Sequence, residues 1–402
     1  MTRVAGGWLK VPEAELSVPG GLPDPFVCLD GFRVTSAAEW FERRRPELMG
    51  LFARQMYGVT PQVTLPMRTH VRSEDATALD GRSTRIEVRL AFGSPGDAPV
   101  GAEPTLNLLV HLPNGAAGPV PLFLALNFRG NHEVEVGRQG EPWPFAHLVE
   151  RGYGVATLCY EEIEPDVDGP ATGNADAGHW SGRLGILRHP VFLAADAARR
   201  AGERWGSLGA WAWGLSRAMD YLVGNPRVDA MRVIVAGHSR LGKAALWAAA
   251  QDLRFAMAVS NNSGCGGVAL SRRLVGETVD AITSRFPRWF CGNFAGYAGR
   301  EGTLPFDQHL LVALVAPRPV YVASAEDDTW ADPYGEFLGA RYADPIYQLL
   351  GVEGIGATSM PPVSSPVPSR IGYHIRPGGH AMTAYDWERF ADAADRHLPA
   401  RV

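Results

Sequence analysis

Residues 233–247 read VIVAGHSRLGKAALW, an apolar run that passes through Gly237, His238 and Ser239 directly into a helical pattern. A strand-to-helix turn of this kind holds a serine above the edge of a sheet, at the N-terminus of a helix. The N–H groups and positive dipole end of that helix stabilise a negative oxygen that forms in front of the serine. The stretch therefore predicts a nucleophile elbow with Ser239 as the nucleophile.

The glycine spacing departs from the G-x-S-x-G pattern typical of such elbows. Leu241 occupies the position of the second glycine, and Gly242 comes one residue later. A bare G-x-S is common by chance, and a serine at a strand-to-helix junction often serves only as a helix N-cap. The apolar strand before Ser239 and the helix after it favour the nucleophile over the cap.

Strand and helix patterns alternate on both sides of the elbow. Short apolar runs bounded by glycine or proline predict buried strands, and apolar residues at helical spacing predict the helices between them. Strands are expected at 85–92, 105–113, 121–128, 152–160, 231–237, 255–261, 319–325 and 371–376, and helices at 37–57, 206–223, 244–251 and 385–397. This alternation predicts a mostly parallel central sheet covered on both faces, in a three-layer αβα sandwich. Together with the elbow it indicates the α/β-hydrolase fold.

No internal repeat, low-complexity tract or long linker divides the chain, so a single domain over residues 1–402 is expected. With 402 residues, of which 46% are hydrophobic and 20% charged, the chain can bury a large core. Residues 1 to about 35 are rich in proline and glycine, which predicts an arm over the core. A helix-rich insertion is expected at about 270–315.

Charge and hydropathy exclude several classes of partner. The formal net charge is -5, and the absence of any run of lysine or arginine argues against nucleic acid and anionic membranes. No stretch approaches the roughly 18 apolar residues that span a membrane, and the N-terminal segment lacks the apolar core of a secretory signal. A small-molecule or neutral polymeric substrate is expected. A cytoplasmic location and a removed signal both remain open.

Four cysteines, Cys28, Cys159, Cys265 and Cys291, are spread along the chain. They show no CxxC or Cys/His spacing of the kind that a structural zinc site requires, so we expect no metal and no other cofactor. Four cysteines are too few for a disulfide-built scaffold, although one bridge remains possible. Cys265 and Cys291 form the pair to test.

A serine hydroxyl becomes a strong nucleophile only when a base accepts its proton. In this fold the chain order is serine, acid, histidine, and the histidine lies between the last strand and the last helix. His380 has that position, with Gly378 and Gly379 beside it in the loop RPGGHAMT. His374 lies inside the preceding strand, where a hydrogen-bonded sheet residue is expected. His380 is therefore the candidate base.

The acid of the triad is expected after the strand at 319–325. There the loop EDDTWADP carries Glu326, Asp327, Asp328 and Asp332. A carboxylate in this place would hold the imidazole in one tautomer and stabilise the imidazolium. Four acids within seven residues are also typical of a solvated loop, and position alone does not choose among them.

Several longer motifs make the sequence resemble the glucuronoyl esterases of carbohydrate esterase family 15, over most of residues 120–390. They are GHSRLGKAALW at 237–247, NNSGCGG at 261–267, RRLVGET at 272–278, FPRWF at 286–290, LPFDQHLLVALVAPRP at 304–319, SAEDDTWADPYGEFL at 324–338 and GYHIRPGGH at 372–380. The family pattern G-x-S-R-x-G-K also accounts for the displaced Gly242.

The resemblance implies roles for six side chains. They are Ser239 as nucleophile, His380 as base, Arg240 as a side chain that assists the oxyanion hole, Lys243 as a contact to sugar hydroxyls, Glu277 as a sugar-binding acid and Trp330 as the tryptophan beside the glucuronate ring. A guanidinium next to the nucleophile adds a full charge to backbone stabilisation of an oxyanion. The flat apolar face of a tryptophan suits the C–H face of a pyranose.

One position departs from the family pattern. Many members carry the triad acid as a glutamate on the strand after the nucleophile helix, where this chain has Asn262. An amide cannot stabilise an imidazolium as a carboxylate does. Other bacterial members carry an aspartate two residues before the tryptophan, and Asp328 holds that position here. We therefore assign the acid to Asp328, with Asp327 and Glu326 as alternatives.

These residues and the resemblance predict a serine esterase that hydrolyses esters of (4-O-methyl-)glucuronic acid, as in lignin–carbohydrate linkages of glucuronoxylan. The resemblance further implies a monomer that is secreted or periplasmic. Two other functions remain open. One is an esterase for another carbohydrate ester, such as acetyl-xylan. The other is a carbohydrate-binding pseudoenzyme, which Asn262 in the usual acid position suggests.

Overall fold

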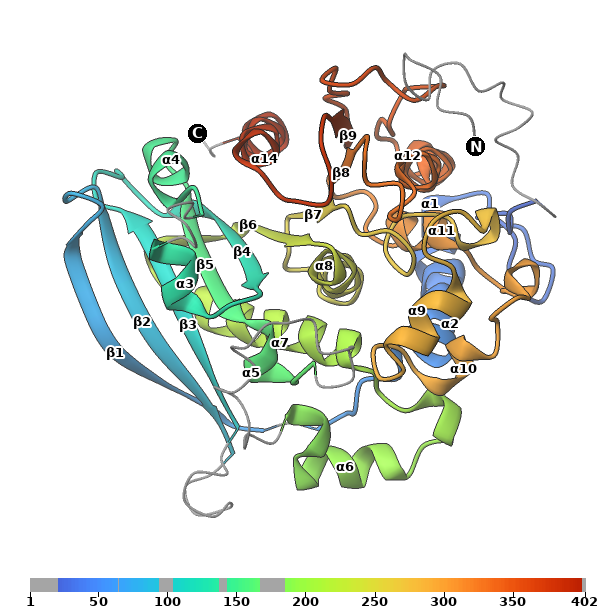
Figure 1. Ribbon diagram of the computed structural model, residues 1–402, viewed down its shortest axis with the longest axis horizontal. Coiled ribbons are helices and arrows are strands. Elements are labelled where there is room, and N and C mark those ends of the chain that lie inside the picture. Colours follow the sequence, from blue (N-terminus) through green and yellow to red (C-terminus); the bar gives the residue numbers. More distant parts are fainter. Residues whose placement is uncertain (1–20, 64, 94–103, 137–142, 167–184, 400–402) are drawn as a thin grey trace.

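The computed structural model describes residues 21–63, 65–93, 104–136, 143–166 and 185–399 (Figure 1). Nine strands of this part form one sheet in the order β1-β2-β3-β5-β4-β6-β7-β8-β9. Their bounds are β1 (Met67–Ala78), β2 (Ser83–Phe92), β3 (Thr105–Pro113), β4 (Val120–Asn127), β5 (Gly154–Cys159), β6 (Val228–His238), β7 (Met257–Asn261), β8 (Val320–Ala325) and β9 (Ile371–Arg376). The eight strands expected from the sequence are all present.

The sheet is parallel from β5 to β9 and antiparallel at its other end. β4 pairs in parallel with both β5 and β6, and the parallel pairing continues through β7, β8 and β9. β1, β2, β3 and β5 pair antiparallel in that order. The predicted mostly parallel sheet is confirmed. β1 was not expected, because its sequence MRTHVRSEDATA is polar and almost wholly exposed. Charged side chains of this kind protect a sheet edge from further pairing.

Helices cover both faces of the sheet, as the α/β-hydrolase fold requires. The helices are α1 (Ala37–Glu39), α2 (Arg45–Phe52), α3 (Asn131–Val136), α4 (Phe145–Glu150), α5 (Tyr160–Ile163), α6 (Pro190–Ala197), α7 (Ser207–Leu222), α8 (Arg240–Gln251), α9 (Val279–Arg285), α10 (Gly292–Ala295), α11 (Gln308–Ala313), α12 (Pro333–Arg341), α13 (Asp344–Leu349) and α14 (Ala384–His397). α4 and α14 lie on one side of the central strands, and α7 and α8 lie on the other (Figure 1).

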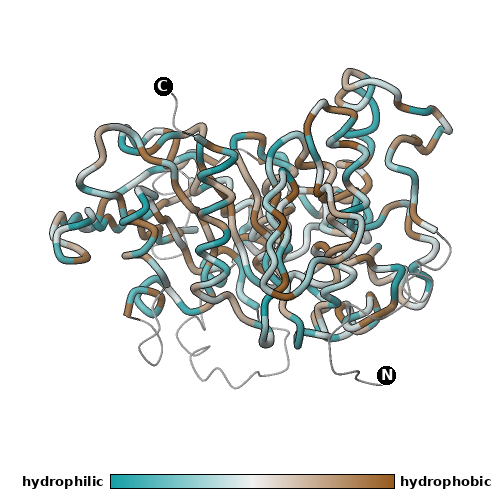
Figure 2. Tube along the Cα trace, turned by 90° about the horizontal axis from the view of Figure 1, so that it is seen from above, coloured by the Kyte–Doolittle hydropathy of each residue, from teal (hydrophilic) through white to brown (hydrophobic). Residues whose placement is uncertain are grey.

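Alternate residues of the central strands belong to two separate hydrophobic cores, one on each face of the sheet. In β4, Leu122 and Leu124 join the larger core, which includes α7 and α8, whereas Phe123 joins the smaller core under α4 and α14. Two-residue alternation of this kind is how a strand buried on both faces contributes to two layers. Such a strand is apolar along most of its length, whereas over the whole trace hydrophobic (brown) and hydrophilic (teal) segments are interspersed (Figure 2).

α8, the helix that follows the elbow, is enclosed on all sides. Every residue from Leu241 to Ala250 is buried. Trp247 is fully buried, and its ring stacks on that of Tyr57 with 4.7 Å between centroids. Tyr57 ends the helical segment 37–57, in which α1 and α2 alternate with two π-helical turns. The elbow serine is thus mounted on a helix that packing holds in place.

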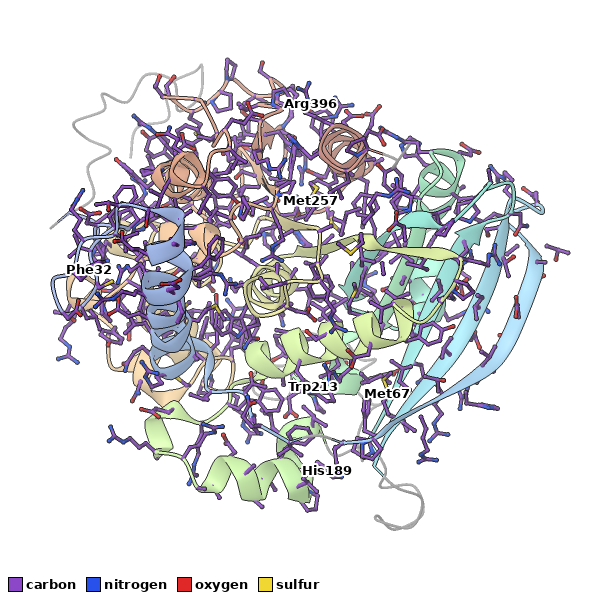
Figure 3. The ribbon with its side chains drawn as sticks, turned by 180° about the vertical axis from the view of Figure 1, so that it is seen from behind. Phe32, Met67, His189, Trp213, Met257 and Arg396 are labelled. Atoms are coloured by element: carbon purple, nitrogen blue, oxygen red, sulfur yellow. The ribbon has the colours of Figure 1, made fainter. Side chains whose placement is uncertain are left out.

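The expected insertion and arm are only partly visible. Within 270–315 the structure shows α9, α10 and α11 with two short 3-10 turns. Residues 21–36 of the arm form turns and one isolated bridge, between Val27 and Arg33, and the remainder of the arm lies outside the described residues. Between these two segments of the chain, Trp213 of α7, which Figure 3 labels, packs against Phe192 of α6 with 5.5 Å between ring centroids. Whether 1–402 is a single domain remains a prediction.

Cys265 and Cys291, the pair singled out for a possible disulfide, are not bridged. All four cysteines are buried free thiols. The Cys291 thiol donates to the Arg54 carbonyl at 3.5 Å, and burial raises its pKa above the ordinary value. Among the described residues, no group of histidine, cysteine and acidic side chains is arranged to hold a metal ion. None of the described helices combines the length and apolarity that crossing a membrane requires.

Replacing Trp247 by alanine tests how strongly packing holds α8. Since the indole is fully buried against Tyr57, we expect Trp247→Ala to lower the free energy of unfolding by about 3–5 kcal/mol. Met231→Ala is the control, because Met231 is 61% exposed and its loss should change stability by no more than about 0.5 kcal/mol. Urea titration measures both. Equal stabilities of the two variants would contradict this account of α8.

Candidate active site

The elbow at Ser239 has the strained backbone that its sequence predicts. β6 ends at His238, α8 begins at Arg240, and Ser239 between them has φ 57° and ψ -130°. A non-glycine residue reaches this region only when its surroundings enforce it. The Ser239 N–H donates to the Asn261 carbonyl at 2.8 Å. The Ser239 side chain makes no N-cap hydrogen bond to α8, so the reading of this serine as a helix cap is wrong.

Two glycines make the turn possible. A Cβ on Gly237 would lie 2.1 Å from the Leu241 carbonyl oxygen, which no side chain tolerates. A Cβ on Gly242 would lie 3.0 Å from the Gly237 carbonyl oxygen and 3.3 Å from Cβ of Ser263. The displaced glycine therefore serves the close approach between the turn and the segment after β7. The departure from G-x-S-x-G has a steric basis in this chain.

His380 lies beside the elbow and is hydrogen-bonded to Asp328. The His380 Nδ1 to Asp328 Oδ2 distance is 2.6 Å. The Asp328 side chain is buried, whereas that of His380 is 43% exposed. Burial raises the pKa of Asp328, but hydrogen bonds from His380 and Asn262 outweigh it, so that the pKa lies below its ordinary value. Asp328 is therefore charged at neutral pH. A hydrogen bond at Nδ1 leaves Nε2 of His380 as the nitrogen available for proton transfer.

Asn262, which occupies the family's usual acid position, supports Asp328 directly. Its Nδ2 donates to Asp328 Oδ2 at 2.7 Å, the same oxygen that His380 contacts. Asn262 is buried and has a positive φ of 45°. Its Oδ1 has no hydrogen-bond partner among the described residues. Sequence reasoning treated this residue as a missing charge and did not foresee its role as a donor.

His238 is a second histidine next to His380, which the sequence gave no reason to single out. Their ring centroids are 4.5 Å apart. Nδ1 of His238 is 2.6 Å from Oδ1 of Asn261, whose Nδ2 in turn donates to Asp386. Burial and the neighbouring His380 lower the pKa of His238 to about 4. His238 is thus neutral at neutral pH and adds no charge beside the base.

Arg240, the residue after Ser239, has partners on two other segments of the chain. Its guanidinium is ion-paired with Asp166 and lies 4.6 Å from the centre of the Trp289 ring. Trp289 Nε1 also donates to Asp166, at 2.9 Å. The Phe286 ring stacks on Trp289 with 3.7 Å between centroids. An aromatic wall and one carboxylate therefore fix the position of this cation.

Lys243, Glu277 and Trp330 come together from three segments. Lys243 Nζ donates to the Ser263 carbonyl at 2.6 Å and lies 3.6 Å from Glu277 Oε2. The Glu277 N–H donates to the Trp330 carbonyl at 2.8 Å. Lys243 is buried and does not lie on a solvated helix face. The Trp330 side chain is half exposed, as a platform for a ligand would be.

Glu336, in the first turn of α12, carries a fully buried carboxyl group. It accepts hydrogen bonds from Ser324 Oγ at 2.6 Å and the Gly264 N–H at 3.0 Å. Burial raises its pKa to about 8, so Glu336 is largely protonated at neutral pH. Glu336 therefore adds no full negative charge to the surroundings of Asp328.

His374 is the sheet residue that the sequence predicted. It is fully buried, and its Nε2 lies 2.8 Å from Asp386 Oδ1. Nδ1 lies 3.1 Å from the Tyr321 hydroxyl. Both ring nitrogens have partners inside the protein, so His374 does not compete with His380 for the role of base.

Comparison with known proteins identifies relatives of this chain. Residues 200–351 match the family model described as glucuronyl esterase, fungi. The carbohydrate esterase MZ0003, from an unknown prokaryotic organism, is 42% identical over 94% of this chain and 89% of its own length. The 4-O-methyl-glucuronoyl methylesterase of Schizophyllum commune is 30% identical over 82% of this chain and 74% of its own length.

A solved structure extends the similarity to three dimensions. It is a family 15 carbohydrate esterase, described as promiscuous, from a marine bacterial metagenome. It is 40% identical, covers 95% of this chain and 98% of its own, and has a TM-score of 0.83. On the fold, the motifs and these comparisons, the chain belongs to the glucuronoyl esterases of carbohydrate esterase family 15.

Proposed function

We propose that this protein hydrolyses esters of 4-O-methyl-glucuronic acid, with Ser239, His380 and Asp328 as its catalytic triad. The observation that carries the proposal is the 2.6 Å hydrogen bond between His380 and Asp328 beside a strained elbow serine. The family supports the substrate class, since the Schizophyllum commune relative is a 4-O-methyl-glucuronoyl methylesterase.

In the first half-reaction Ser239 Oγ attacks the C6 carbonyl of the glucuronate ester. Nε2 of His380 accepts the serine proton, and Asp328 stabilises the imidazolium that results. The tetrahedral intermediate collapses to an acyl-enzyme, and His380 gives its proton to the departing alcohol. A water molecule, activated by the same nitrogen, then attacks the acyl-enzyme and releases the glucuronic acid.

The oxyanion of each tetrahedral intermediate forms in front of the N-terminus of α8. The N–H groups of Arg240 and Leu241 belong to the first helical turn and come before the first N–H that donates within it, that of Gly242 to the Ser239 carbonyl at 2.9 Å. They and the dipole of the twelve-residue α8 favour negative charge at this point. The Arg240 guanidinium, held by Asp166 and Trp289, adds positive charge beside the same oxygen.

The sugar ring is assigned to the side of the site where Trp330, Lys243 and Glu277 meet. Half of the Trp330 surface is exposed, which suits stacking on the C–H face of a pyranose. The Lys243 and Glu277 pair places a donor and an acceptor close behind it, 3.6 Å apart. The natural ester is proposed to be on glucuronoxylan, and the protein to act as a secreted or periplasmic monomer.

A second candidate function is hydrolysis of other carbohydrate esters, such as acetyl-xylan. The description of the marine relative as promiscuous favours considering it. The pseudoenzyme alternative has lost its support, because Asp328 supplies the carboxylate that Asn262 lacks.

Comparing two substrates tests the proposed function. With a methyl ester of 4-O-methyl-glucuronate and an acetylated xylo-oligosaccharide, we expect the larger kcat/KM for the glucuronate ester. A serine-directed phosphonate should label the protein at Ser239, and Ser239→Ala should lose both labelling and turnover. A preference for the acetyl ester would overturn the substrate assignment. Unchanged activity in Ser239→Ala would overturn the mechanism.

Exchanging single acids in the loop after β8 tests the choice of Asp328. We expect Asp328→Asn to lower kcat by about 10⁴-fold, because an amide leaves the imidazolium unstabilised. Asp327→Asn is the matched control: it makes the same change one residue away, at an exposed side chain, and should keep near wild-type kcat. Steady-state kinetics on the glucuronate ester decides. The reverse pattern would assign the acid to Asp327.

Removing Arg240 tests the oxyanion role. Loss of one such donor costs about 10² to 10³ in rate, so Arg240→Ala should reduce kcat by that factor with a small effect on KM. Arg285→Ala is the control, since Arg285 is an exposed arginine that also lies over the Phe286 ring, 5.3 Å from its centre. If both variants keep wild-type kcat, Arg240 has no part in stabilising the oxyanion.

A further inference from the structure

Arg376, a buried arginine at the end of β9, is hydrogen-bonded to the loop that carries His380. Arg376 Nη1 donates to the Pro377 carbonyl at 2.9 Å. Its Nη2 donates to the Gly379 carbonyl at 3.2 Å and to the Ala381 carbonyl at 2.6 Å. One guanidinium thus binds the carbonyl groups immediately before and after His380. The rigid fork of five donors in arginine is suited to such a set of acceptors.

The guanidinium is itself anchored by Asp386. Arg376 Nε lies 2.9 Å and 3.1 Å from the two oxygens of this fully buried carboxylate. Asp386 also accepts from the Thr383 N–H at 2.6 Å and from the Thr383 hydroxyl at 2.8 Å, which closes a capping box at the start of α14. From the first turn of α14, Asp386 therefore binds both ends of the loop, at Arg376, the last residue of β9, and at Thr383, the N-cap of α14.

The His380 loop is also hydrogen-bonded to the loop after β8, which carries Asp328. The Glu326 N–H donates to the Arg376 carbonyl at 2.9 Å, and the Asp327 N–H donates to the Gly378 carbonyl at 3.0 Å. The parallel pairing of β8 with β9 ends at Ala325 and Arg376, so these two bonds continue it into both loops. The backbone positions that carry Asp328 and His380 are thus fixed relative to each other.

We propose that Arg376 is a positioning residue, which holds the loop so that His380 stays within hydrogen-bond distance of Asp328. The inference rests on the proposed role of His380 as the base. The His380 side chain is 43% exposed, so burial of the side chain does not fix its place, and the loop backbone must do so. A misplacement of about 1 Å can cost about 10²-fold in rate.

Arg376→Lys tests the proposal, because lysine keeps a positive charge for Asp386 but cannot reach three carbonyls and a carboxylate at once. We expect kcat on the glucuronate ester to fall by about 10². KM should stay within a factor of about two, since within the described residues the guanidinium hydrogen bonds of Arg376 go to the His380 loop and to Asp386. The rate of phosphonate labelling at Ser239 should fall with kcat, because labelling also needs the base.

Arg318→Lys is the matched control, at the end of the strands that lies opposite the His380 loop. Arg318 stands just before β8, and its guanidinium likewise donates to several backbone carbonyls, including Ala249 at 2.7 Å and Phe255 at 2.8 Å. The same substitution there removes a comparable set of bonds without touching the His380 loop. We expect Arg318→Lys to lower the stability to urea while kcat and the labelling rate remain those of the wild type.

A double variant covers the case in which Arg376→Lys does not fold. Arg376→Gln with Asp386→Asn leaves no unpaired buried charge, and its folding is checked by circular dichroism. Wild-type kcat and labelling rate in either folded Arg376 variant would overturn the proposal. An equal loss of kcat in Arg318→Lys would do so as well, because the effect would then be one of general stability. Absence of wild-type turnover would instead overturn the proposed function.

Discussion

The hydrogen bond between His380 and Asp328 is the interaction on which the rest of the site depends. A serine at an elbow is a weak nucleophile until an oriented base accepts its proton, and this contact orients His380, the proposed base. The two residues meet because β8 and β9 are parallel neighbours, so that the loops after them leave the same edge of the sheet. The elbow after β6 opens at that edge too, and His238 brings it against His380.

A buried carboxylate is stable only if its surroundings replace the water it has lost. Asp328 receives hydrogen bonds from His380 and from the amide of Asn262. Nearby, Glu336 is largely neutral at pH 7 because burial raises its pKa to about 8. Glu336 therefore adds no full negative charge beside Asp328. An asparagine at position 262 is consistent with that arrangement, because a second ionised acid would raise the pKa of Asp328.

The sequence predicted those features that follow local rules. The apolar strands, the elbow at Ser239 and the place of His380 all depend on short-range patterns and on chain order. β1 escaped prediction because an edge strand with polar side chains has no apolar alternation. The supporting roles of Asp166, Asn262 and Arg376 also escaped it, because each depends on contacts formed only after folding. Four acids in one loop could not be ranked from position, and the three-dimensional contact with His380 distinguishes Asp328.

Nuclear magnetic resonance of the protein with ¹⁵N-labelled histidine tests the central contact most directly. When a phosphonate is bound covalently to Ser239, His380 is expected to be protonated. The proton on Nδ1, between His380 and Asp328, should then appear far downfield in the proton spectrum. The account predicts that this resonance is present in the wild type and in Asp327→Asn, and absent in Asp328→Asn. A downfield resonance that survives in Asp328→Asn would show that another group orients the base, and would contradict the account.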